Sequence, residues 1–166
     1  MLFRSGKTTL AKALGETNRL RDHSVQTERS KYLRDLGIPL NTDSTLRGQF
    51  IFLAERATEL LYENIITDRT IWDVSAFTLS AKSIKDWEKR DFVTAAMHLK
   101  DYYDVVIYVS PDGVDMEDNG IRETDLTYRT KIDQVIRMLL EEYKPNKLIT
   151  VSGSTNDRIA TILSNL

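Results

Sequence analysis

The residues best suited to chemistry stand at the start of the chain, in the run Ser5, Gly6, Lys7, Thr8 and Thr9. A glycine, a lysine and a hydroxyl residue that lead into an apolar helix form the second half of the phosphate-binding motif G-x-x-x-x-G-K-[ST]. Backbone N–H groups at a helix N-terminus attract negative charge, and glycine lets a phosphate approach them closely. The alternative is a plain capped helix start, because Ser and Thr are common there.

If the run binds a nucleotide, each side chain has an expected role. Lys7 spans the β- and γ-phosphates, Thr8 gives its hydroxyl to Mg²⁺, and Ser5 and Thr9 supply further donors. The motif also requires a glycine five positions before Gly6, where this chain has Met1. The match is therefore accidental, or the loop is a variant, or the sequence lacks its beginning.

A second polar pair, Asp68 and Arg69, follows the short β-branched run NIIT. An acid at the end of a buried strand can hold the magnesium shell or accept the proton of an attacking hydroxyl. Asp68 is also a candidate N-cap for the next helix, and the two roles can coexist. For Arg69 the plain alternative is a surface ion pair. Asp73, in the first turn of that helix, is expected to complement the helix dipole.

The elements that must position these residues alternate between helices and strands. Apolar periodicity predicts helices over 5–14, 30–36, 46–63, 71–83, 86–103, 127–143 and 155–166, and strands over 23–27, 64–70, 105–109 and 148–153. This order favours right-handed β-α-β units and an α/β fold, with a parallel sheet covered by helices on both faces. The chain is expected to form a single domain over residues 1–166.

The most regular of these patterns is the helix over 46–63. Thr42, Asp43 and Ser44 are its N-cap candidates. Its expected apolar face consists of Phe50, Leu53, Ala54, Ala57 and Leu61. The first helix, by contrast, is expected to stop at Gly15.

Composition narrows the class of protein. With 41% apolar and 29% charged residues, the chain suits a globular domain with a core rather than a disordered segment. A net charge of -2 gives no bulk attraction to nucleic acid or anionic lipid, so a small-molecule partner is expected. No apolar run approaches the roughly 20 residues that span a bilayer, and we expect a cytoplasmic protein. Without cysteine, thiolate metal sites are excluded.

These motifs resemble those of a known group of enzymes. SGKTTLAKAL resembles the phosphate loop of P-loop nucleoside and nucleotide kinases, and ITDRTIWDVSAF is similar to their D-R-[ST] or D-R-Y segment after the third strand. Residues 102–143 resemble the fourth strand, arginine-bearing lid and following helix of the subgroup that includes nicotinamide riboside kinase and related AAA-type P-loop kinases. The resemblance covers most of the chain from Ser5 on, and it implies ATP and Mg²⁺ as cofactors.

The resemblance also implies roles for particular residues. Arg69 contacts the substrate or the transferring phosphate. Arg122 and Arg129, on a lid over about 112–128, close over the γ-phosphate and neutralise charge in the transition state. Glu28 and Gln49 match positions that face the acceptor. The plain alternatives are a solvated charged loop for the two lid arginines and exposed, solvated side chains for Glu28 and Gln49.

In the kinases that the chain resembles, a central first strand precedes the phosphate loop, whereas here LFR occupies loop positions. We therefore expect a three-layer P-loop NTPase fold that lacks most of this strand, and an N-terminal fragment in which residues 1–4 are not native sequence. The two neighbouring strands would then have ladder N–H and C=O groups without partners.

The function that the resemblance implies is ATP-dependent transfer of the γ-phosphoryl group to a small nucleoside- or nucleotide-like acceptor. Two alternatives remain open. One is a regulatory nucleotide-binding ATPase module. The other is a kinase of 5'-hydroxyl ends of nucleic acids, which the net charge disfavours.

Overall fold

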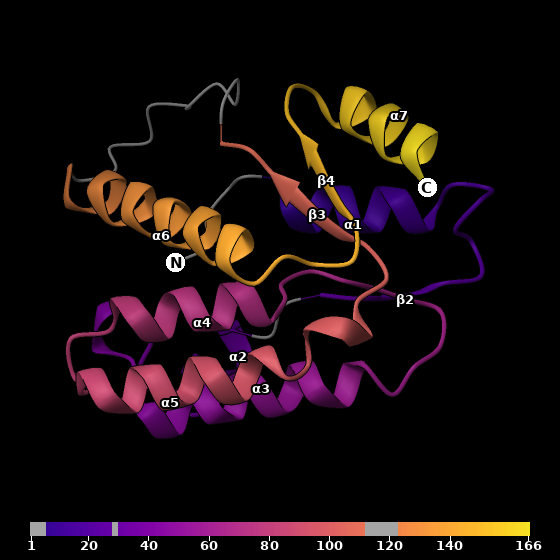
Figure 1. Ribbon diagram of the computed structural model, residues 1–166. Coiled ribbons are helices and arrows are strands. Elements are labelled where there is room, and N and C mark those ends of the chain that lie inside the picture. Colours follow the sequence, from indigo (N-terminus) through magenta and orange to yellow (C-terminus); the bar gives the residue numbers. More distant parts are fainter. Residues whose placement is uncertain (1–5, 28–29, 112–122) are drawn as a thin grey trace.

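Helices alternate with short strands throughout the computed structural model, which describes residues 6–27, 30–111 and 123–166 (Figure 1). The elements are α1 (Lys7–Gly15), β1 (Ser24–Gln26), α2 (Ser30–Asp35), α3 (Leu46–Glu59), β2 (Ile65–Thr67), α4 (Ile71–Ser80), α5 (Asp86–Met97), β3 (Val106–Val109), α6 (Glu123–Glu142), β4 (Leu148–Val151) and α7 (Thr155–Asn165). Single 3-10 turns occupy Asn41–Asp43 and Lys100–Tyr102. The predicted α/β class is confirmed. In the described ranges, no helix combines the length and apolar character needed to cross a membrane.

The strands form two separate parallel pairs. In the first pair, Ser24 of β1 lies opposite Ile65 of β2. In the second, Val106 of β3 lies opposite Leu148 of β4. Within the described residues no ladder joins β2 to β3. The expected three-layer sheet is therefore seen only as two halves, and they are separated where the resemblance places its central strand.

The side chains of β3 alternate between two apolar clusters, as the pleat of a strand requires. Val109 packs with Leu10 and Leu14 of α1 and with Ile162 of α7. Val106 packs on the other side, in a cluster that α4 and α6 supply. Helices therefore cover both faces of the β3 and β4 pair (Figure 1).

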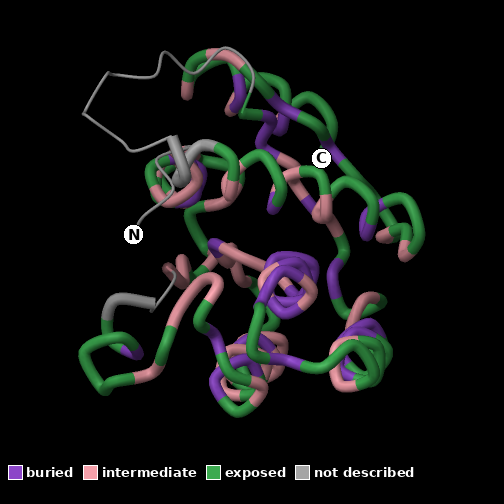
Figure 2. Tube along the Cα trace, turned by 90° about the vertical axis from the view of Figure 1, so that its left-hand side faces the viewer, coloured by how far each residue is buried: buried purple, intermediate pink, exposed green. Residues whose placement is uncertain are grey.

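Helix α4 is the most deeply buried helix in the part of the chain that the structure describes. Eight of its ten residues are buried, because α3, α5 and α6 pack around it. Trp72 is 1% exposed, and its indole N–H donates to the carbonyl oxygen of Tyr143 at 3.1 Å. In Figure 2 the buried positions gather where helices meet, and the exposed ones lie on loops and outer faces. The segment that begins α4 is thus held on several sides.

Helix α3 begins at Leu46, as predicted, but its N-cap, its C-terminal end and its buried face differ from the prediction. Its N-cap is Thr45, whose hydroxyl accepts from Gly48 N at 3.2 Å, and the helix ends at Glu59. Phe50 and Leu61, expected to be buried, are 47% and 83% exposed. The inward face instead follows positions 49, 52, 53, 56 and 60, and Gln49 and Arg56 are its buried polar members. An apolar pattern cannot reveal this face, because polar residues occupy two of its central positions.

Gly15 ends α1, as predicted, but for a different reason. Its φ is not positive, so no left-handed turn stops the helix there. A Cβ atom added to Gly15 would lie 2.4 Å from Cγ2 of Val25. Glycine at this position therefore lets β1 pack directly against the end of α1.

Candidate functional site

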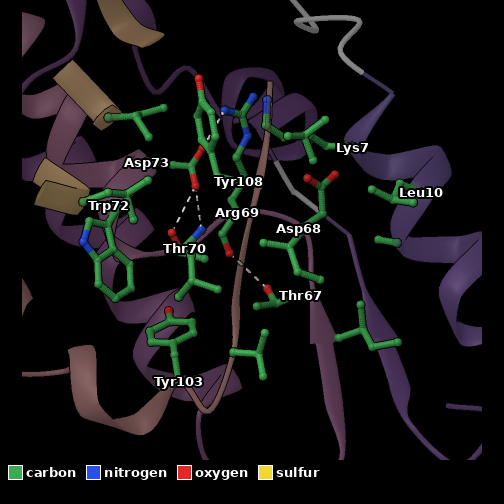
Figure 3. A pocket seen from close by; sticks show the side chains of 18 of the residues that line it. Lys7, Leu10, Thr67, Asp68, Arg69, Thr70, Trp72, Asp73, Tyr103 and Tyr108 are labelled. Atoms are coloured by element: carbon green, nitrogen blue, oxygen red, sulfur yellow. Dashed lines mark hydrogen bonds and ion pairs between the residues drawn. The ribbon is translucent and has the colours of Figure 1, made fainter. Parts of the chain in front are cut away.

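The predicted phosphate loop and the end of β2 meet at a cavity of about 160 Å³ between the two strand pairs (Figure 3). Side chains from α1, β2, β3, α4 and α6 line it. Most of the lining is apolar, and its charged members are Lys7, Asp68, Arg69, Asp73 and Asp133. The facing edges of β2 and β3 are two of its walls.

Gly6 shapes the backbone that leads into α1. It caps the helix with φ 71°, a left-handed conformation that favours glycine, and its carbonyl accepts from Leu10 N at 2.8 Å. A Cβ atom on Gly6 would also lie 3.3 Å from Nη1 of Arg158. Glycine is therefore favoured both by conformation and by the space that the Arg158 guanidinium takes up.

Arg158 is a buried cation that the sequence analysis missed. It comes from α7, is 3% exposed and brings its guanidinium beside the phosphate-binding loop. The available signal was its spacing, since Arg158 precedes the fully buried Ile162 by one helical turn. A second positive charge therefore stands at the N-terminus of α1, where the helix dipole already favours an anion.

Lys7 occupies the first position of α1 and reaches the charged part of the cavity (Figure 3). Burial lowers the pKa of its ammonium group below the ordinary lysine value. Asp73, Asp68 and Asp133 oppose this shift, whereas Arg69 adds to it. The positive charge is thus poorly hydrated in the folded chain, and an anion that bound beside it would relieve that cost.

Thr8 and Asp68 lie in direct contact, although sixty residues separate them. The Thr8 hydroxyl donates to the carboxylate of Asp68, which is 5% exposed. The backbone N–H of Asp68 continues the strand ladder and donates to the carbonyl oxygen of Gln26 at 2.9 Å. The alternative role of Asp68 as a helix N-cap is wrong, because Thr70 caps α4.

Arg69 and Asp73 form an ion pair at the start of α4. Arg69 Nη1 lies 3.2 Å from Asp73 Oδ1, with both side chains less than 15% exposed, so the pair is not the surface contact weighed for Arg69. The Arg69 guanidinium also stacks over Phe77, 5.4 Å from the ring centre. Asp73 Oδ2 accepts from the backbone N–H and the hydroxyl of Thr70, at 2.9 and 3.1 Å. Asp73 lies in the first turn of α4, where an acid complements the helix dipole as predicted, and it also forms a capping box with Thr70, which was not predicted.

The electrostatics of Asp73 follow from these contacts. Burial alone would raise the pKa of its carboxyl group. The Arg69 and Lys7 cations, together with the Thr70 hydrogen bonds, outweigh burial and hold the pKa below its ordinary value. Asp73 is therefore ionised at neutral pH and offsets part of the positive charge in the cavity.

A third polar group lines the opposite wall, between β3 and α6. The Tyr108 hydroxyl donates to Asp133 Oδ1 at 2.5 Å. Arg137 Nε donates to Asp133 Oδ2 at 2.9 Å, and its guanidinium lies over the Tyr108 ring at 5.2 Å. Burial, with the hydrogen bond to Asp133, raises the pKa of Tyr108 well above its ordinary value. This cluster joins residues 25 apart in the chain, and it was not predicted.

Other predicted site residues are not brought to the cavity. Gln49 is 3% exposed inside α3, so it is not solvated, and it is absent from the cavity lining. Thr9 is exposed on α1, and Arg129 is half-buried on α6; neither is part of the lining. Ser5, Glu28 and Arg122 lie outside the described residues. The helix predicted over 127–143 begins four residues earlier, at Glu123, so the last part of the segment 112–128 is helical, and its residues 112–122 lie outside the described residues.

The donor set fits magnesium bound together with a nucleotide better than it fits a bare metal ion. Among the described residues, no three His, Asp or Glu side chains gather in a way that would hold a metal. Thr8 and Asp68 supply one hydroxyl and one carboxylate. Mg²⁺ commonly takes only one or two protein oxygens and fills its remaining positions with phosphate and water.

Comparison with known proteins agrees with this geometry. No curated protein and no solved structure gives a significant match. A family model described as an AAA domain matches residues 5–158, a range that takes in the loop at Gly6, the Asp68 turn and all four strands. The chain therefore belongs to the AAA domain family, of the P-loop NTPase type.

Proposed function

We propose that this protein is an ATP-dependent phosphotransferase that moves the γ-phosphoryl group to a small nucleoside- or nucleotide-like acceptor. Its family supports nucleotide binding and hydrolysis in general. The narrower proposal depends on one observation: the Arg69 and Asp73 pair stands beside Lys7 and Asp68 in the same cavity. Arg69 is a second cation near the position where a γ-phosphate would meet an acceptor.

Residues of α1 hold the nucleotide in this proposal. Backbone N–H groups from Gly6 onward bind the phosphates at the helix N-terminus, and Lys7 spans the β- and γ-phosphates. Thr8 and Asp68 hold Mg²⁺, which supplies charge neutralisation between those phosphates when it is bound. Burial already weakens the hydration of Lys7, so contact with phosphate costs it little further desolvation.

Asp68 and Arg69 act on the acceptor side. The Asp68 carboxylate accepts the proton of the attacking hydroxyl, and Arg69 orients the transferring group. Asp73 keeps the Arg69 guanidinium in place through the 3.2 Å ion pair. Phosphoryl transfer demands little covalent chemistry of a protein, so this positioning provides most of the rate enhancement.

The acceptor class comes from the resemblance to kinases related to nicotinamide riboside kinase. We propose a nucleoside or a nucleotide, whose hydroxyl or phosphate receives the γ-phosphoryl group. Arg122, Arg129 and Glu28 remain predictions for the lid and the acceptor side. Gln49 is not proposed as an acceptor contact, since it is buried away from the cavity.

The test uses γ-labelled ATP with a panel of nucleosides and nucleotides. We expect transfer to at least one acceptor to be faster than release of phosphate to water. Lys7→Ala should abolish transfer, whereas Lys12→Ala, which changes an exposed lysine of the same helix, should leave it unchanged. Equal rates for Lys7→Ala and the unaltered chain would overturn the assigned role of Lys7.

The second candidate is a regulatory ATPase module, which the family match itself favours because it supports nucleotide hydrolysis and not transfer. The same panel separates the two functions. Release of phosphate to water that no acceptor can outcompete would favour the ATPase module.

A further inference from the structure

Arg56 lies behind the turn that carries Asp68 and Arg69, outside the lining of the cavity. It comes from α3 and is 2% exposed. We propose that Arg56 is a positioning residue, which fixes the backbone at Asp68 and Arg69 and thereby aims both side chains at the phosphate-binding loop. This inference rests on the proposed function, because it assigns a purpose to the same site.

One nitrogen of the Arg56 guanidinium, Nη1, donates hydrogen bonds to the backbone of the turn. This nitrogen donates to the carbonyl oxygen of Asp68 at 3.1 Å and to that of Arg69 at 3.3 Å. β2 ends at Thr67, so these two carbonyls lie beyond the strand. Buried carbonyl groups need partners, and a guanidinium can serve two neighbouring ones at once because its N–H groups form a rigid fork.

Glu59 holds the guanidinium from the other side. Arg56 Nη2 lies 2.7 Å from Glu59 Oε1, three residues later on α3. Glu59 Oε2 in turn accepts from the Thr67 hydroxyl at 2.6 Å. The Arg56 charge is thus paired where it is buried, and the ring of contacts ties α3 to the end of β2.

The turn itself needs such support. Arg69 has φ 93°, in a region that residues with side chains seldom adopt. Backbone of this kind persists only where its surroundings over-determine it. Arg56 fixes the turn through its carbonyls, while Asp73 fixes it through Thr70 N and the Arg69 side chain.

With this backbone conformation, the neighbouring side chains of Asp68 and Arg69 point to different partners. The Asp68 carboxylate accepts from the Thr8 hydroxyl. The Arg69 guanidinium pairs with Asp73 (Figure 3). The Arg69 carbonyl also accepts from the Thr67 hydroxyl at 3.3 Å, but Arg56 is the donor that reaches both carbonyls. If the Arg56 donor were lost, the turn would relax and both side chains would shift. Arg56 would therefore influence the reaction without touching a nucleotide or an acceptor.

The test compares Arg56→Met and Arg56→Lys with Arg47→Met, which alters an exposed arginine of the same helix. Hydrogen exchange of residues 66–73 is measured well below the unfolding temperature, together with kcat and KM for transfer. For Arg56→Met we expect at least tenfold faster exchange in this segment. We also expect kcat to fall by about 10²-fold, with KM for ATP nearly unchanged, as misplaced reacting groups would cause. Arg56→Lys should recover part of both, and Arg47→Met should match the unaltered chain.

A purely structural role predicts a different pattern. Arg56→Met would then unfold at a lower temperature, yet its folded form would keep normal exchange and normal kcat, and the proposal would be overturned. If Arg56→Met does not fold, Arg56→Lys decides: intermediate exchange and kcat support positioning, and unaltered values contradict it. Should the unaltered chain transfer no phosphate to any acceptor, the proposed function fails, while exchange of residues 66–73 still tests whether Arg56 fixes the turn.

Discussion

The two halves of the candidate site are built in different ways. Charged side chains of the protein stabilise the turn after β2. Arg56 donates a hydrogen bond to the carbonyl oxygen of Asp68, and Asp73 accepts from Thr70 N and pairs with Arg69. The loop before α1 instead depends on the conformation of Gly6 and carries a partly desolvated Lys7. The charges of the turn are paired within the folded chain, whereas a bound anion would offset the desolvation of Lys7 at the loop. Loss of a charge in the turn should therefore reduce stability and activity together, whereas loss of the Lys7 charge should reduce binding and activity.

The largest effect is expected for a substitution in the loop, and it tests whether the loop serves binding and not stability. Lys7→Ala should lower the rate of phosphoryl transfer by about 10³-fold, since a preorganised charge at the transferring group is lost. Its unfolding temperature should stay the same or rise slightly, because a poorly hydrated ammonium group is removed. Thermal unfolding and transfer rates are measured side by side, with Lys12→Ala as the control. A clear fall in unfolding temperature for Lys7→Ala would contradict the distinction between the halves.

The second effect falls on the turn. Asp73→Asn removes the charge that Arg69 faces and weakens the cap on α4, and we expect a loss of about 2–3 kcal/mol in the free energy of unfolding. Urea unfolding at neutral pH measures it. Transfer activity should fall as well. A variant with full stability would show that the ion pair does not hold the turn.

A pair of glycine substitutions sharpens the account of the loop. Gly6 and Gly37 both have positive φ, but a Cβ atom on Gly6 would crowd Arg158, while one on Gly37 would meet nothing within 4 Å. Each change to alanine should cost about 1–2 kcal/mol for the left-handed conformation. Only Gly6→Ala should also weaken nucleotide affinity. Equal affinities for the two variants would show that the space at Gly6 is not needed for binding.

The smallest expected effect is on the stability of the folded chain at acidic pH. Because the pKa of Asp73 is lower in the folded chain than in the unfolded chain, its stabilising contribution is present above the unfolded value of about 4. That contribution is lost as the pH falls through the folded value. The stability difference between the unaltered chain and Asp73→Asn should therefore shrink between pH 5 and the acid limit, as urea midpoints across this range would show. A difference that stays constant would rule out the lowered pKa.

Sequence patterns predicted the parts of this molecule that depend on local signals. Both the loop at Gly6 and the turn at Asp68 carry recognisable motifs. The loop leads into the helix α1, and the turn follows the strand β2 and leads into the helix α4. The structure brings Lys7, Asp68 and Arg69 together at one cavity, as parallel strands and their following segments would, and Thr8 contacts Asp68 from outside the lining. The end of α1 at Gly15 and the place of Asp73 in the first turn of α4 also follow from short-range rules.

Features that depend on distant packing were missed. Arg56 and Gln49 are polar residues on the inward face of α3, so the apolar pattern identified Leu53 correctly but also included the exposed Phe50 and Leu61. Its N-cap, Thr45, was missed, because the predicted candidates Thr42, Asp43 and Ser44, one to three residues earlier, are equally suited to cap a helix. The helical spacing between Arg158 and Ile162 indicates that Arg158 is buried, but it does not reveal that Arg158 lies beside Gly6. The Tyr108–Asp133 contact joins elements far apart in the chain, and no local spacing reveals it.

The central claim is that the N-terminus of α1 binds the phosphates of a nucleotide through Lys7. Calorimetric titration with ATP in the presence of Mg²⁺ tests it most directly, using the unaltered chain and Lys7→Ala under the same conditions. We expect one ATP to bind per chain, with affinity at least about 10²-fold weaker for Lys7→Ala. No detectable binding to the folded, unaltered chain, or equal affinity in the two proteins, would contradict the account.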